Sequence, residues 1–150
     1  MNLFSLLRPV AVLLVAVGIL NLPDRASAEE RPYHSRSTAL LNLATGDFVA
    51  AGKATHLGKY TEIGSISISG DDPTALHVEG SATLTAANDD ELRVVITGEM
   101  NFLTGTITGT LTFDGATTGR FEDATGSASL VAQVQADGTI TIVVVGTIDY

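Results

Sequence analysis

From Asp47 to the C-terminus, apolar and polar side chains alternate with a period of two residues, and this pattern limits the fold more than any other feature of the chain. In 76–86 the even positions are apolar or small and the odd positions are polar. Such alternation is typical of antiparallel strands that bury one face and expose the other. The alternating runs are 48–60, 76–86, 91–102, 103–113, 125–135 and 139–148.

Short polar turns connect these runs. Asn88-Asp89-Asp90 and Asp137-Gly138 have the composition of hairpin turns, and Gly70–Pro73 is another polar turn. Consecutive strands joined in this way form a meander, which leaves two long unprotected edges unless the sheet closes. We therefore expect an all-β fold, a closed antiparallel up-and-down β-barrel of about eight strands, in one domain over 45–150. A β-sandwich is the alternative.

The N-terminus has the pattern of a secretory signal peptide. Residues 1–8 carry one basic side chain, and Pro9–Leu20 form an uncharged apolar run of twelve residues. Ala26-Ser27-Ala28 supplies the small residues of a cleavage site. An uncleaved membrane anchor would need about 20 apolar residues. We expect cleavage after Ala28 and a secreted or periplasmic protein of 122 residues.

The segment 29–44 lacks the clean alternation of the rest of the chain. It carries charges around Pro32 and a short apolar stretch at Ala39–Leu41. Either a flexible leader or a short first strand is consistent with this composition, and the sequence leaves both open.

The balance of charge limits the partners of the protein. The chain has 17 acidic and 8 basic residues, and without residues 1–28 the counts become 16 and 6, a net charge of −10. Such a surface repels phosphate backbones and anionic lipids, so we expect no binding to nucleic acid and no membrane association after signal removal. The absence of cysteine excludes disulfides and a thiol nucleophile. A closed fold is therefore the expected source of stability.

Two blocks of sequence resemble a known superfamily. The run Gly115–Ala128 (GATTGRFEDATGSA) resembles a G-G-T-G-R-F-x-x-A-x-G segment of allene oxide cyclase and dirigent barrels, with Ala116-Thr117 where the family has Gly-Thr or a second Gly. Gly52–Thr61 (GKATHLGKYT) is similar to a block in uncharacterised exported bacterial proteins that carry the same G-R-F motif. Together the blocks cover about 24 residues, and the resemblance implies a barrel.

The resemblance also implies a class of ligand. Allene oxide cyclases isomerise a fatty-acid epoxide and dirigent proteins direct the coupling of phenoxy radicals, so both bind apolar molecules inside the barrel. The acidic and aromatic residues of those sites match no positions here, and no catalytic residue is carried over. Fold alone does not establish function.

Three residues are candidates for ligand binding: His56, Tyr60 and Arg120. If the alternation of 48–60 is unbroken, His56 and Tyr60 share the inward face, where an imidazole is able to act as acid or base. The alternative, which we favour, is a histidine hydrogen-bonded near a barrel end. Arg120 is able to clamp a carboxylate ligand. We favour a structural role for it, in which it ties its loop to an acid or to carbonyl groups.

We expect no cofactor and no metal. His34, His56 and His77 lie far apart and show no metal-ligand spacing, and the acidic turns lack the pattern of a calcium loop. The sequence also has no G-x-S-x-G nucleophile elbow.

Three functions therefore remain. We favour an exported, non-catalytic β-barrel that binds a small apolar ligand in its interior. The second is a cyclase or isomerase acting on a hydrophobic substrate, with His56 beside Tyr60 or Glu99. The third is a structural or oligomerising extracellular module, which forms homo-oligomers.

Overall fold

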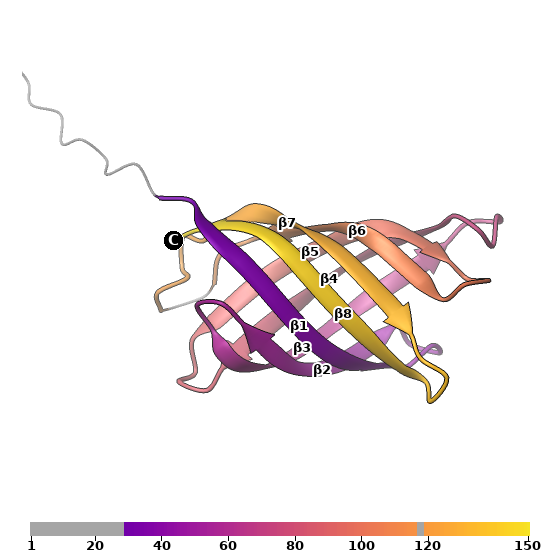
Figure 1. Ribbon diagram of the computed structural model, residues 1–150, viewed down its shortest axis with the longest axis horizontal. Helices are drawn as coiled ribbons and strands as arrows, with labels where there is room; N and C mark the ends of the chain where they lie inside the picture. The colour runs from indigo at the N-terminus through magenta and orange to yellow at the C-terminus, as the bar shows by residue number, and fades with distance from the viewer. Residues whose placement is uncertain (1–28, 117–118) are drawn as a thin grey trace, which may run out of the picture.

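The computed structural model describes residues 29–116 and 119–150, and it confirms the closed antiparallel β-barrel over the sandwich (Figure 1). The described residues contain no helix, and hence none long and apolar enough to cross a membrane. The eight strands are β1 (Arg31–Leu41), β2 (Asp47–Ala54), β3 (Gly58–Ser69), β4 (Leu76–Ala86), β5 (Glu91–Asn101), β6 (Thr106–Phe113), β7 (Thr125–Val134) and β8 (Thr139–Asp149).

Each strand pairs antiparallel with the next one along the chain, and β8 pairs with β1 to close the barrel. The closing register runs from Arg31 opposite Ile148 to Leu40 opposite Thr139. Closure gives both edges of every strand a hydrogen-bonded neighbour, so no strand edge is left open to another chain. Because the chain has no cysteine, the hydrogen bonds of this closed sheet hold the fold together without disulfides.

The barrel begins at Arg31 and not at residue 45. Residues 31–41 form β1, which pairs with both β2 and β8, so this part of the segment 29–44 belongs to the barrel. Ser35 and Ser37 occupy two of its inward positions and are buried. Serine at inward positions interrupts the apolar alternation, and for this reason the sequence did not distinguish a strand from a leader.

The turn between β5 and β6 is longer than the sequence suggests. The run expected at 103–113 begins its strand only at Thr106. Oδ1 of Asn101 accepts hydrogen bonds from the backbone N–H groups of Leu103 and Thr104 at 3.1 Å, and Gly105 has a φ of +68°. The turn therefore places Phe102 and Leu103 in solvent, although their positions fit the alternating pattern.

One end of the barrel is sealed by aromatic side chains. The loop from β6 to β7 places Phe121 over this end with no exposed surface, and its ring centroid lies 4.7 Å from that of Tyr150. Beneath it the rings of Tyr33 and Phe113 make an edge-on contact at 4.8 Å. We call this end, which also carries the C-terminus in Figure 1, the sealed end.

Candidate functional site

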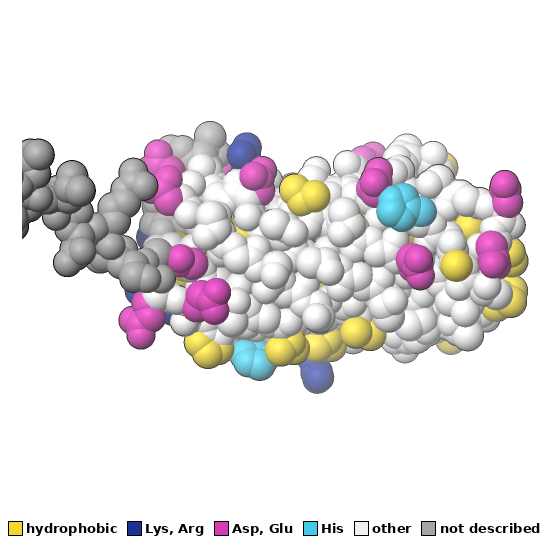
Figure 2. Space-filling view, turned by 90° about the horizontal axis from the view of Figure 1, so that it is seen from above, with side chains coloured by type: hydrophobic (Ala, Val, Ile, Leu, Met, Phe, Trp, Pro, Cys, Tyr) yellow, Lys and Arg dark blue, Asp and Glu magenta, His cyan; other side chains and the backbone are white. Residues whose placement is uncertain are grey.

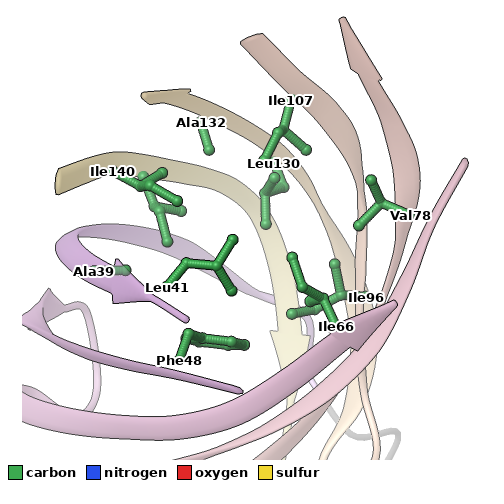
Figure 3. A pocket seen from close by; sticks show the side chains of 11 residues that line it. Ala39, Leu41, Phe48, Ile66, Val78, Ile96, Ile107, Leu130, Ala132 and Ile140 are labelled. Atoms are coloured by element: carbon green, nitrogen blue, oxygen red, sulfur yellow. The ribbon is translucent and has the colours of Figure 1, made fainter. Parts of the chain in front are cut away.

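The opposite half of the barrel contains an apolar cavity of about 50 Å³ (Figure 3). All eight strands contribute to its wall, and no polar side chain lines it. A wall of this composition takes apolar groups and offers nothing to a charged one. The lining residues are Ala39, Leu41, Phe48, Ile66, Val78, Ile96, Ile107, Leu130, Ala132, Ile140 and Ile142.

The volume of this cavity limits what it holds. An engineered apolar cavity of about 150 Å³ accommodates benzene, and sites for drug-sized ligands measure about 300–1,000 Å³. In the described conformation the cavity therefore accommodates a narrow group, such as the end of an alkyl chain. Leu41, Ile66 and Ile142 are only partly buried, so movement of these side chains enlarges it without disturbing the centre of the core.

A buried polar cluster lies deeper in the barrel, and we define it as Tyr33, Ser35, Ser37, Tyr60 and Glu62. Ser35 and Glu62 are each 7% exposed. The Tyr60 hydroxyl and Ser35 Oγ share a hydrogen bond of 2.6 Å.

The polar cluster forms because β2 carries small side chains on its inner face. β1 supplies Tyr33, Ser35 and Ser37, β3 supplies Tyr60 and Glu62, and β2 lies between them. The residues of β2 that pair with these residues of β1 and β3 have small side chains, namely Ala50, Gly52 and Ala54. Side chains of β1 and β3 therefore meet over β2.

Glu62 is the one carboxyl group of the polar cluster. Burial raises the pKa of its carboxyl group to about 7. No described residue donates a hydrogen bond to this carboxyl, and no basic side chain pairs with it. A buried carboxyl group without partners favours its neutral form. Burial also raises the pKa of Tyr33 and of Tyr60, so both phenols stay protonated at neutral pH.

Phe48 lies at the boundary between the polar cluster and the cavity. Its side chain lines the cavity, and a Cβ at Gly64 would meet its Cζ at 2.6 Å. Gly64 separates Glu62 from the cavity-lining Ile66 along β3. The Phe48 ring therefore covers the stretch of β3 that connects the two regions, and it must move before a ligand in the cavity reaches Glu62.

Of the three residues singled out from the sequence, only Tyr60 lies in the interior. It is buried, and it belongs to the polar cluster. Its position agrees with the inward face expected from the alternation of 48–60.

His56 does not take the inward position that an unbroken alternation of 48–60 predicts, and it agrees with the alternative favoured from the sequence, a histidine hydrogen-bonded near a barrel end. β2 ends at Ala54, and His56 lies in the turn to β3 with a φ of +72°. Its Nε2 donates to the carbonyl oxygen of Pro32 at 3.0 Å, and its ring meets that of Tyr150 at 5.5 Å. His56 is therefore a hydrogen-bonded residue of the sealed end, on the opposite side of the core from the cavity.

Glu99 is not a partner of His56 or of Tyr60. It is exposed on the outer face of β5, opposite His77 of β4. Its odd position within β5 places it on the solvent side, because the inward residues of that strand, such as Met100, have even numbers.

Arg120 holds three loops together at the sealed end. Its Nε forms an ion pair of 2.9 Å with Oδ2 of Asp90, and its guanidinium donates a hydrogen bond to the carbonyl oxygen of His56. The guanidinium also lies 4.7 Å from the ring centroid of Phe121. These contacts connect the β6–β7 loop to the β2–β3 and β4–β5 turns, and they leave Arg120 distant from the cavity.

Sequence reasoning missed Glu62, although a signal for it was present. Within 58–69 the even positions hold Tyr60, Gly64, Ile66 and Ile68, and Glu62 is the one charged residue in this set. A charge on the apolar side of an alternating strand marks a buried titratable group.

The described part of the chain contains no cluster of three or more His, Cys, Asp and Glu side chains able to hold a metal ion. No family model matches the chain, and comparison with curated proteins and with solved structures gives no match either.

Proposed function

We propose that the protein is an exported, non-catalytic β-barrel that binds the apolar part of a small ligand in the cavity in the half of the barrel opposite the sealed end. The observation that carries this proposal is the convergence of eleven apolar side chains, from all eight strands, on one cavity. The N-terminal pattern supports export, and it lies outside the described residues.

The energetics favour a ligand with an alkyl or aryl end. Each buried CH₂ group contributes about 0.8 kcal/mol to transfer from water, so a few carbons in the cavity give weak binding. Tighter binding requires Leu41, Ile66 and Phe48 to move apart, which lets more of the ligand leave water. We therefore expect affinity to rise with the length of the apolar chain until the cavity stops expanding.

Filling the cavity is expected to weaken binding. Ala132 lines the cavity, and Ala132→Leu projects an isobutyl group into it. We expect the affinity for N-dodecyl dansylamide, a neutral fluorescent probe whose alkyl chain is narrow enough for the cavity, to fall about tenfold or more, measured by fluorescence titration. Ala51→Leu, at an exposed position on β2, is the matched control and keeps the affinity of the parent chain. Equal affinities for the two variants, or no binding by the parent chain, would contradict the proposal.

A second function has a specific observation in its favour. Glu62 titrates near neutral pH beside the hydrogen-bonded Tyr60 and Ser35. Groups with a pKa close to the working pH transfer protons efficiently. This supports an isomerase that acts on a hydrophobic substrate, with Glu62 as the proton donor and acceptor in place of His56. It requires the Phe48 ring to move aside.

The substrate class to test is a fatty-acid epoxide, which the superfamily resemblance implies. If the protein is an isomerase, chromatography of the products shows that the parent chain converts the epoxide. Glu62→Gln is then expected to lower the rate of this conversion about 100-fold. Glu122→Gln, exposed in the β6–β7 loop, is the control and retains the rate. Failure of the parent chain to convert the epoxide, together with binding of the alkyl dansylamide probe, would leave the binding function as the supported one.

A further inference from the structure

Apart from Asp149 at the end of β8, the outer face of β6, β7 and β8 lacks charge, in a chain that carries 17 acidic residues. Figure 2 shows acidic side chains mainly toward the two ends of the barrel, with a broad stretch of uncharged surface between them. We call this surface the neutral face. It comprises Thr106, Thr108, Thr110, Thr112, Ser127, Ser129, Val131, Gln133, Thr139, Thr141, Val143, Val145 and Thr147.

One row of residues crosses the neutral face and ends in opposite charges. The strand registers place Arg36 beside Val143, Val143 beside Val131, Val131 beside Thr108, and Thr108 beside Glu99. Val131, at the middle of this row, is 51% exposed. The row is thus apolar at its centre, positive at the β1 end and negative at the β5 end.

The two charged residues at the ends of the row form no ion pair within the described part of one chain. Arg36 and Glu99 are exposed, and neither forms an ion pair with another described residue. A half-turn about an axis that runs along β7 through Val131 exchanges the two ends of the row. The positive end of one copy then faces the negative end of the other. A surface with this property is self-complementary, as a two-fold symmetric interface requires.

We propose that two copies of the chain associate through their neutral faces, with the two-fold axis along β7. Arg36 of each copy then faces Glu99 of the partner subunit. Val131 and Val143 form the apolar centre of the contact, and the threonine and serine hydroxyls surround it.

The charge of the chain favours a second copy as the occupant. Two chains with a net charge of −9 repel each other wherever their acidic surfaces meet. The neutral face lets two copies approach without that repulsion, and its paired end charges add attraction. Depletion of charge at the centre of a patch is also the compositional signal of an interface. Because the closed barrel has no free strand edge, the contact is face to face.

Sedimentation velocity and light scattering test this association. The protein for these measurements is expressed from the full chain, with its own N-terminal segment. We expect the mass of two chains for the parent protein and of one chain for Val131→Glu, which places two carboxylates at the centre of the contact. Thr61→Glu, exposed on the outer face of β3, is the matched control and stays dimeric. A monomeric parent chain at the highest soluble concentration, or a dimeric Val131→Glu, would overturn the proposal.

Charge exchange provides a test that does not disturb the centre of the face. Arg36→Glu and Glu99→Arg each place like charges opposite each other, and we expect each to raise the dimer dissociation constant about tenfold. The double variant restores opposite charges and is expected to recover the parent dissociation constant. Single variants that dimerise like the parent chain, or a double variant without recovery, would contradict the assigned axis.

Discussion

Replacement of Glu62 by glutamine is expected to stabilise the protein above pH 7 and to leave its stability nearly unchanged near pH 4. Burial raises the pKa of this carboxyl from 4.5 to about 7, so the folded state holds the proton more tightly than the unfolded state does. The free energy of unfolding of the parent chain therefore falls as pH rises from about 4.5 through 7, because the folded state must then bury an ionised carboxylate.

The size of this effect follows from the shift of the pKa. At about 1.4 kcal/mol per unit, the parent chain loses about 3 kcal/mol between acidic pH and pH 9 through this one group. Glutamine has no such charge, so Glu62→Gln is more stable than the parent chain by up to about 3 kcal/mol at pH 9. Urea unfolding at pH 5, 7 and 9 measures the difference.

The exposed Glu122 supplies the control for this experiment. Glu122→Gln is expected to follow the stability curve of the parent chain at each pH, because its carboxyl is solvated in both the folded and unfolded states. A Glu62→Gln protein that loses stability at pH 9 relative to the parent would show that the buried carboxylate has a stabilising partner, which is the opposite of the arrangement described above.

Truncation of Phe121 is expected to be the most destabilising single change at the sealed end. The Phe121 side chain has no exposed surface, and its ring packs on Tyr150 at 4.7 Å. Phe121→Ala opens a cavity beneath the β6–β7 loop and is expected to cost about 3–5 kcal/mol. Thermal unfolding followed by circular dichroism should show a clearly lower midpoint.

Phe102 is the matched control, because it has the same side chain but is 61% exposed in the β5–β6 turn. Phe102→Ala is expected to change the free energy of unfolding by no more than about 0.5 kcal/mol. Similar losses in the two variants would mean that the β6–β7 loop does not seal the barrel in solution.

The architecture was predictable because most strands after residue 46 show the alternation that a closed sheet with a dry interior requires, with Glu62 of β3 as an exception. The position of His56 was not, because the turn from Thr55 to Leu57 contains three residues. Inward positions are therefore even-numbered on both sides of the turn, and the alternating pattern of the sequence continues through the turn without a break. His56 takes a left-handed conformation that glycine usually supplies, so composition gave no warning of the turn.

The polar cluster depends on register, which a sequence pattern does not contain. Ser35 and Tyr60 are brought together because β1 and β3 are both paired to β2 at particular offsets, with Gly52 opposite both Ser37 and Tyr60. The volume of the cavity likewise depends on how side chains from eight strands pack, and alternation says only which of them point inward.

The pairing of β1 with β8 has a consequence for the order of events in folding. Of the eight described strands, β8, which closes the barrel, is synthesised last, and its partner β1 is synthesised first. Every shorter length of the chain therefore presents two open edges, on β1 and on whichever strand was made most recently. Contacts so distant in sequence form slowly, because a long loop must close before they contribute. The protein is thus most exposed to misassembly just before its final strand is in place.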